Sequence, residues 1–173
     1  SPTLSYYILN MHTGRLILIF SEAVNATSLM PREFTLHNSA SPTFSFTLTG
    51  GAVSVEDGTT VSINITTPDL NFLKQREDLA TGSPTTFLSL TSDAVSDMNG
   101  NDVVAINATE PQQVLIFIDD RLAADLVNFD LNMDLGLLTL EFSETMNASW
   151  VDVESITLQS IENNEGATAS HQN

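Results

Sequence analysis

The segment LNMHTGRLILIFSEAVNA at Leu9–Ala26 returns as LNMDLGLLTLEFSETMNA at Leu131–Ala148. The match extends without a gap from Leu4–Leu36 to Leu126–Leu158, at a constant offset of 122 residues. Of these 33 aligned positions, 14 are identical. An internal repeat decides what one domain is, so it takes precedence over every other pattern in the sequence. This repeat indicates a tandem array with a unit of about 122 residues.

The chain is strongly acidic. It carries 22 Asp and Glu residues against five Lys and Arg residues, which gives a formal net charge of −17. Such a charge opposes binding to nucleic acid and to anionic membrane surfaces. The absence of cysteine excludes disulfides, thiolate zinc sites and cysteine nucleophiles. No apolar run approaches the ~18 residues of a membrane-spanning helix. We therefore expect no nucleic-acid partner and no membrane span.

Short β-type segments, separated by turn residues, follow one another through the first unit. Thr60–Thr66 alternates apolar and polar residues, as a strand with one buried face does. Only Pro68–Ala80 has helical spacing, and Asp69 is placed to cap it. The pattern predicts an all-β sandwich. The expected strands are Leu4–Met11, Arg15–Phe20, Phe34–Leu36, Phe44–Thr49, Ala52–Glu56, Thr60–Thr66, Thr86–Thr91, Asp102–Ile106 and Gln113–Ile118.

The two copies differ on one face of their second strand. Ile17 and Ile19 of the first copy become Thr139 and Glu141 in the second. We expect these two isoleucines either to lie beneath a loop or to form an interface with another unit or subunit. The opposite face is identical in both copies, as a shared core requires. Its residues are Leu16, Leu18 and Phe20, and Leu138, Leu140 and Phe142.

Several phrases occur in an order that resembles a known family. They are FSEAVNATSL (Phe20–Leu29), the strand pair around Asp57-Gly58, the stretch after Asp69, and DMNGN (Asp97–Asn101). Together they resemble the bacterial Ig-like tandem repeats of surface-layer and adhesin proteins, and similar arrays occur in giant extracellular filament proteins of aquatic microbes. The resemblance implies Ig-like antiparallel β-sandwich repeats in tandem, with one short helix per unit in this chain. It also implies an extracellular or cell-surface location and no enzymatic activity.

The repeat sets the expected domain boundaries. Residues 1–122 should form one complete Ig-like repeat, and residues 123–173 the start of a second, incomplete one. The second copy has too few strands to close a sandwich. We expect its missing strands to come from further chain or from a neighbouring subunit by strand addition. A folded Leu126–Leu158 with its apolar face bare to solvent is not expected.

Four sequons fit N-glycosylation, at Asn25, Asn64, Asn107 and Asn147. Asn25 and Asn147 occupy the same position in the two copies. Asn64 points away from the apolar face of its strand, where a glycan would stand in water. The alternative is that these asparagines serve turn chemistry alone. Covalent glycans are therefore expected partners, with Asn25 and Asn147 as the best-supported sites.

Two acidic segments are candidate calcium sites, because calcium prefers oxygen ligands. Asp97, Asn99, Asn101 and Asp102 crowd into a glycine-containing turn, which by itself also explains a simple chain reversal. Asp119 and Asp120 lie at the junction between the two copies, where calcium would stiffen the linker. Glu22 and Glu144 are further acidic candidates for such junctions, although the sequence does not show their position.

The most consistent function is a non-catalytic structural repeat of an extracellular, glycosylated filament or cell-surface fibre that assembles end to end. Its partners would be other copies of itself or further repeats of the same chain. One alternative is a calcium-dependent adhesin or carbohydrate-binding module, and another is an accessory domain of an enzyme. His12, His37 and His171 lie in turn or terminal contexts, and no nucleophile elbow, phosphate loop or HExxH motif is present. We expect no cofactor, apart from calcium.

Overall fold

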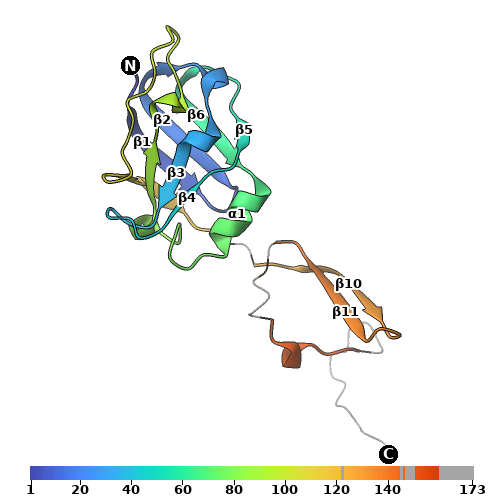
Figure 1. Ribbon diagram of the computed structural model, residues 1–173. Coiled ribbons are helices and arrows are strands. Elements are labelled where there is room, and N and C mark those ends of the chain that lie inside the picture. The colour runs from blue at the N-terminus through green and yellow to red at the C-terminus, as the bar shows by residue number, and fades with distance from the viewer. Residues whose placement is uncertain (122, 145, 147–150, 160–173) are drawn as a thin grey trace, which may run out of the picture.

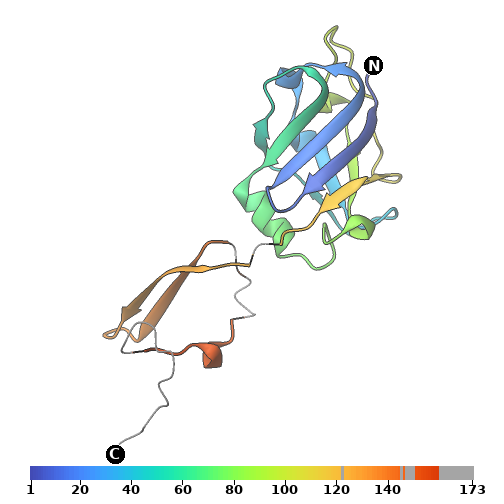
Figure 2. The same ribbon diagram turned by 180° about the vertical axis from the view of Figure 1, so that it is seen from behind.

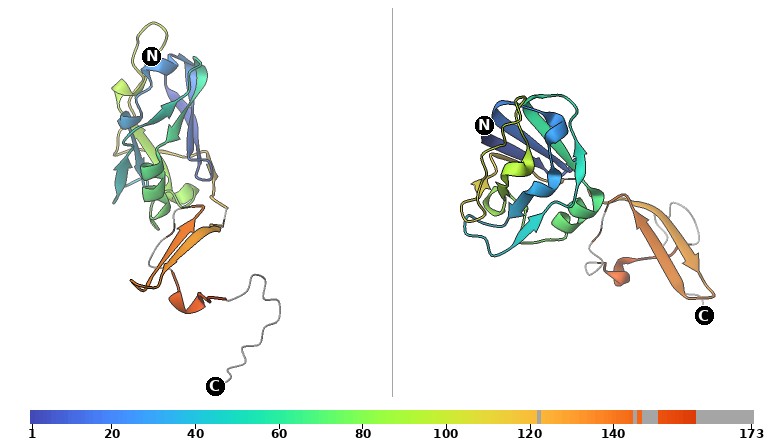
Figure 3. Two further views of the ribbon diagram at one scale, coloured as in Figure 1. Left: turned by 90° about the vertical axis from the view of Figure 1, so that its right-hand side faces the viewer. Right: turned by 45° about the horizontal axis from the view of Figure 1, so that its top comes forward.

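The computed structural model describes residues 1–121, 123–144, 146 and 151–159. Figure 1 shows a β-sandwich formed by the N-terminal part of the chain and a separate β-hairpin. Both views of Figure 3 place this hairpin beyond one end of the sandwich, while the N-terminus lies at the opposite end. The expected all-β sandwich is confirmed.

Five strands form the first sheet, in the order β5-β6-β2-β1-β9. They are β1 (Leu4–Asn10), β2 (Arg15–Val24), β5 (Gly51–Val53), β6 (Gly58–Ile65) and β9 (Ile116–Ile118). Neighbouring strands are antiparallel, except that β9 lies parallel to β1. This exception pairs Ile8 with Ile116 at the edge of the sheet.

Four strands form the second sheet, in the order β4-β3-β7-β8, and all of them are antiparallel. They are β3 (Phe34–His37), β4 (Ser45–Thr47), β7 (Phe87–Leu90) and β8 (Gln112–Gln113). Figures 1 and 2, seen from opposite sides, show the two sheets face to face. In the part of the chain that the structure describes, one α-helix and several short 3-10 helices connect the strands. They are α1 (Thr67–Lys74), η1 (Ala26–Ser28), η2 (Pro31–Glu33), η3 (Ser83–Thr85) and η4 (Ser92–Ala94), and η6 (Val153–Ser155) follows the hairpin.

The alternation along β2 explains why the sheets stack. Leu16, Leu18 and Phe20 are buried, whereas Ile17 and Ile19 lie on the other face and are half-buried. The buried side chains belong to one core cluster that includes the inner residues of β3 and β7. Burying a side chain of this size contributes about 1.5–3 kcal/mol, so this single row is a large part of the stability of the unit.

Tyr7 ties the two sheets together. It lies in β1 of the first sheet and is fully buried. Its hydroxyl donates toward the carbonyl oxygens of Thr86 and Gln112, each 3.2 Å away, next to or within the strands of the second sheet. Burial raises the pKa of the Tyr7 hydroxyl, so the proton needed for this contact stays in place.

The helix is shorter than the spacing predicts, and its cap is a different residue. It ends at Lys74, and Ala80 adopts a left-handed φ of 54°, which no right-handed helix contains. The N-cap is Thr66, whose side chain accepts from the Asp69 backbone N–H. Asp69 is instead buried and accepts from the backbone N–H and the hydroxyl of Thr49, both at 2.8 Å. Asp69, the expected cap, therefore holds the loop before β5 through these two hydrogen bonds.

Two expected strands also differ from the structure. Asp102–Ile106 makes only the isolated bridges Ser96–Asp102 and Leu90–Ile106. Gln113–Ile118 is divided between β8 and β9, which belong to different sheets. The chain crosses between the sheets here, because Val114 enters the core while the Leu115 backbone N–H donates to Tyr7. A run of apolar residues does not reveal where such a crossing falls.

The second hairpin, β10 (Leu126–Asn132) and β11 (Leu137–Phe142), has the pairing of β1 and β2 shifted by 122 residues. Leu126 pairs with Phe142 as Leu4 pairs with Phe20, and a bulge follows at the same place. Both turns contain a glycine with positive φ, 64° at residue 14 and 61° at residue 136. In both, an Asn side chain accepts from a turn N–H at 3.0 Å.

Burial distinguishes the two hairpins. Tyr7 and Leu9 are 0% exposed, whereas their counterparts Phe129 and Leu131 are 58% and 39% exposed. The expectation that this hairpin would not fold with a bare apolar face is therefore wrong for the single chain. Backbone pairing and the turn form the hairpin from local contacts, and no second sheet covers it among the described residues.

The sequence predicts a turn context for His37. In the structure this residue is buried at the end of β3. Its Nε2 lies 2.7 Å from the Ser89 hydroxyl, while its Nδ1 has no partner. Burial lowers the pKa of His37 below its ordinary value. The imidazole is therefore neutral in the folded protein at neutral pH.

This burial predicts a pH dependence of stability. As the pH falls below about 6.5, the unfolded chain binds a proton at residue 37 before the folded chain does. The free energy of unfolding should therefore be highest above this pH and decrease below it. Urea titrations between pH 7.5 and 5 measure this change. His37→Gln should flatten the dependence, whereas His12→Gln, at an exposed turn, should keep it. An unchanged dependence in His37→Gln would contradict the assignment.

Candidate assembly surfaces

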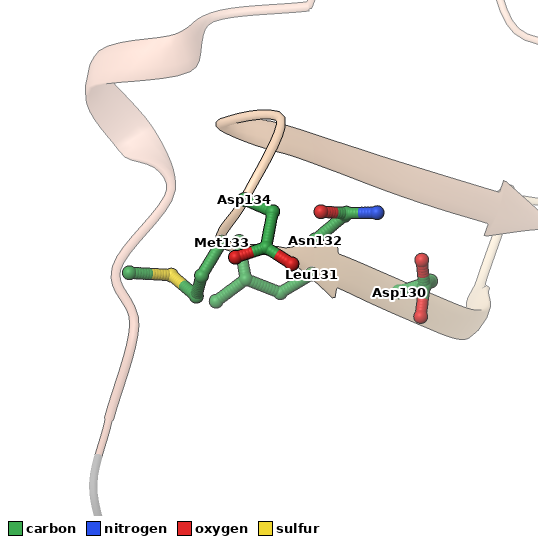
Figure 4. Close-up of a pocket in the computed structure, with 5 residues that line it drawn as sticks. All are labelled: Asp130, Leu131, Asn132, Met133 and Asp134. Atoms are coloured by element: carbon green, nitrogen blue, oxygen red, sulfur yellow. The ribbon is translucent and has the colours of Figure 1, made fainter.

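The inner face of the β10–β11 hairpin is an uncovered core surface. Leu138, Leu140 and Phe142 are half-buried, whereas their first-unit counterparts are buried. Figure 4 shows Leu131 and Met133 extending to the same side of the hairpin end, with Asn132 between them extending the other way. The hollow there is shallow and open, and it holds no enclosed site. Such a face suits packing against another layer.

The outer face of the first sheet is a second apolar surface. Ile17 and Ile19, the expected interface residues, lie on it beside Tyr6 and Ile116. Tyr6 is 38% exposed and Ile116 is 46% exposed, so no loop of the described chain covers this face. Sequence comparison of the copies found the two isoleucines. It missed their neighbours, because only the strand order places β9 beside β1.

The junction between the two bodies contains a lysine that the sequence did not indicate. Lys74 Nζ lies 2.6 Å from Asp120 Oδ2 and 3.4 Å from Glu144 Oε2. His12 Nδ1 lies 3.5 Å from the other Asp120 oxygen. Lys74 is the last residue of α1, Asp120 lies in the linker and Glu144 follows β11. An ammonium group thus occupies the acidic junction for which calcium was considered.

The protonation of Lys74 follows from its neighbours. Burial alone lowers the pKa of Lys74, but hydrogen bonds and charge interactions with Asp120 and Glu144 together outweigh it and raise the pKa. Lys74 is therefore charged at neutral pH. Asp119 is the other expected calcium ligand at the junction. It is exposed, and its Oδ2 lies 4.0 Å from Arg121 Nη2.

The acidic turn at Asp97–Asn101 is held by its own hydrogen bonds. Asp97 Oδ1 accepts from the backbone N–H groups of Asn99 and Asn101 at 2.8 Å, and Oδ2 accepts from the Asn101 side chain at 2.7 Å. These bonds, led by those from Asn101, lower the pKa of Asp97. Asp102 pairs with Ser96 across the turn. This geometry is that of a chain reversal stabilised by an Asp side chain.

The two acidic segments are far apart in the fold. Asp97 bridges to Val24 at one end of β2, whereas Asp120 contacts His12, just before the other end. Glu22, at the Asp97 end, contacts the N-terminal amine at 3.3 Å. Among the described residues, no group of three or more His, Asp or Glu side chains is arranged to hold a metal ion.

The expected glycosylation sites differ in accessibility. Asn64 is exposed on the outer face of β6, and Asn107 is exposed in a loop. Asn25 is half-buried as the cap of η1, and its Oδ1 accepts from the backbone N–H and hydroxyl of Thr27 at 3.0 and 2.7 Å. Asn147 lies outside the described residues.

His37 and Ser89 are as close as a catalytic base and its nucleophile. They are 1% and 7% exposed, however, and the free ring nitrogen has no carboxylate partner to orient it. A substrate cannot reach the Ser89 hydroxyl in this arrangement, so the pair is part of the core. No helix among the described residues is long and apolar enough to cross a membrane.

No protein-family model matches the sequence, and no curated protein matches it. Among solved structures, the chain is similar to the S-layer protein rSbsC, residues 31–844, with 13% identity and a TM-score of 0.43. The similarity covers 82% of this chain and 18% of the S-layer chain, so this chain spans about a fifth of that protein's length. At this distance the likeness does not bear on function.

The Lys74 cluster predicts how firmly the hairpin is held. Lys74→Met removes the ammonium group that contacts Asp120 and Glu144, and a partly exposed cluster of this kind contributes about 1 kcal/mol or less. Small-angle X-ray scattering should therefore show a broader distribution of chain dimensions in this variant. Arg76→Met, which breaks the Arg76–Asp78 pair within the first unit, is the matched control and should leave the distribution unchanged. Equal scattering from Lys74→Met and the unsubstituted chain would contradict the assigned contact.

Proposed function

We propose that this chain is a non-catalytic structural module of an extracellular fibre or surface layer, built from successive β-sandwich units. The observation that supports this most is the β10–β11 hairpin. It has the register, bulge and turn of β1–β2, but no second sheet covers its core face among the described residues. We therefore interpret the hairpin as the beginning of a second unit, whose core face further strands would cover.

Local contacts at the open ends of the hairpins strengthen this interpretation. In the first hairpin, Ser21 donates its backbone N–H to the Thr3 carbonyl and accepts the Thr3 N–H on its hydroxyl. Ser143 and Asp125 make the same two bonds in the second hairpin, at 2.8 and 2.9 Å. Two hairpins that agree in such details are expected to take the same place in a sandwich.

A structural role also fits the surface chemistry. The Ser89 hydroxyl, which contacts the imidazole of His37, is buried in the core and serves the fold. The net charge of −17 keeps such modules apart in solution, except where specific faces meet. Long arrays of this kind act through length and stiffness, because each unit contacts only its neighbours.

A chimera tests whether the hairpin is the start of a sandwich. Residues 1–158 followed by residues 37–122 would supply the second copy with the strands that cover the first. Calorimetry should show an unfolding enthalpy roughly twice that of residues 1–122 alone, since this enthalpy scales with the number of folded residues. The chain of 173 residues should stay close to the value of residues 1–122.

The matched control for the chimera is Leu138→Asp, which places a charge on the inner face of the second copy. This substitution should abolish the added enthalpy, because a buried unpaired carboxylate is strongly destabilising. One cost is built in, since Phe129 has no hydroxyl to replace that of Tyr7. A chimera whose unfolding enthalpy does not exceed that of residues 1–122 would contradict the proposal.

We further propose that the module carries N-linked glycans. After expression through a glycosylating secretory pathway, Asn107 should be modified most completely, because it is exposed in a loop. Asn25 should be modified least, since it is half-buried as the cap of η1. Peptide mapping after enzymatic deglycosylation, which leaves Asp in place of each modified Asn, measures both. Full occupancy of Asn25 with Asn107 unmodified would contradict this order.

A further inference from the structure

The outer face of the first sheet carries a continuous apolar patch across three strands. Ile17, Ile8 and Ile116 lie side by side on β2, β1 and β9, and Ile19 and Tyr6 form the next row. The patch consists of six residues, namely Tyr6, Ile8, Ile17, Ile19, Ile116 and Ile118. Three of them, Tyr6, Ile116 and Ile118, are 38–46% exposed.

The sandwich itself does not require this patch. At the equivalent positions of β10 and β11, Tyr6 is replaced by asparagine and Ile8 by aspartate, while Thr139 and Glu141 replace the isoleucines of β2. The second hairpin pairs in the same register with these polar residues. An ordinary solvated face is therefore compatible with this strand pair, and the apolar residues of the first unit have another use.

The electrostatics of the patch are equally unusual for this chain. The polar residues beside it in the register are Arg15, Asn10 and Asn64 in one row, with Ser62 and Thr60 on β6. None of them is acidic. Arg15 is held flat against the sheet, because its Nη2 donates to the Ser62 hydroxyl at 2.9 Å. The register neighbours of the patch thus carry no carboxylate in a chain that has 22 of them, and Asp119 follows Ile118 at the edge of the patch.

We propose that this patch is a docking face for a second copy of the same chain, packed sheet against sheet across a twofold axis. A copy of the chain carries a charge of −17, so two copies repel each other wherever carboxylates meet. The register neighbours of the patch carry no carboxylate, so this repulsion is reduced where contact is closest. The twofold arrangement uses one patch twice and is the commonest symmetry of soluble oligomers.

The geometry suits face-to-face packing. Sheets stack about 10 Å apart, with side chains of the two faces interdigitating. Branched isoleucine side chains on a pleated surface provide such contacts over three adjacent strands. The patch has far fewer residues than the roughly 20–30 per partner of a standard interface, so association is weak and reversible. Asn64 lies in the row of Arg15 at the rim, so the docked form requires Asn64 without a glycan.

The test is sedimentation velocity of the full, unglycosylated 173-residue chain over a wide concentration range. A reversible monomer–dimer equilibrium is expected, and it should strengthen as salt is raised, because salt screens the repulsion between the acidic copies. The variant Ile17→Thr/Ile19→Glu, which copies the residues of the second hairpin, should weaken the dimer by roughly tenfold or more. Its thermal melt should remain close to that of the unsubstituted chain, since the core is untouched.

Two matched variants separate this face from other apolar surfaces. Val104→Glu changes an exposed apolar residue outside the patch and should leave the dimer intact. Phe129→Asp makes the open hairpin face polar and should also leave it intact. A chain that stays monomeric at about millimolar concentration overturns the proposal. So does a dimer abolished by Phe129→Asp but unaffected by Ile17→Thr/Ile19→Glu. The proposal does not rest on the hairpin being a repeat, so the chimera and this experiment fail independently.

Discussion

The structure depends on covering the apolar face of one β-hairpin. In the first unit, β1 and β2 direct their inner residues against β3 and β7, and the whole row is buried. The same hairpin recurs as β10 and β11 without that cover. Backbone pairing forms both hairpins. Most of the stability of the first unit comes from burial of the inner face, since a two-stranded sheet alone is marginal in water.

Charge decides which surfaces of this chain come together. All five Lys and Arg residues precede residue 122. The charged residues of the hairpin, residues 126–142, are all acidic. Lys74 joins this acidic region to α1 by contacting Asp120 and Glu144 at the same time. The outer face of the first sheet has the opposite character, because its patch is apolar and the register neighbours of the patch carry no carboxylate. The contact between the hairpin region and α1 therefore forms around an ammonium group.

The sequence could predict what periodicity encodes. Alternation placed Leu16 and Leu18 in the core, and comparison of the copies singled out Ile17 and Ile19 as residues that the core does not need. It could not predict what depends on three-dimensional neighbours. The role of Asp69 is set by Thr49, twenty residues away, and the Lys74 cluster joins three distant segments. His37 gave no local sign of burial, because its partner lies on another strand.

Hydrogen exchange of the backbone amides in the monomeric chain tests the central claim, that one hairpin has a core and its repeat does not. The paired amides of β1 and β2 should exchange only through unfolding of the whole sandwich. Those of β10 and β11, equal in register, should exchange faster by roughly three orders of magnitude or more, given a sandwich stability of at least about 5 kcal/mol. Equal protection of the two hairpins would contradict the claim, because it would mean that the inner face of β10 and β11 is covered as well.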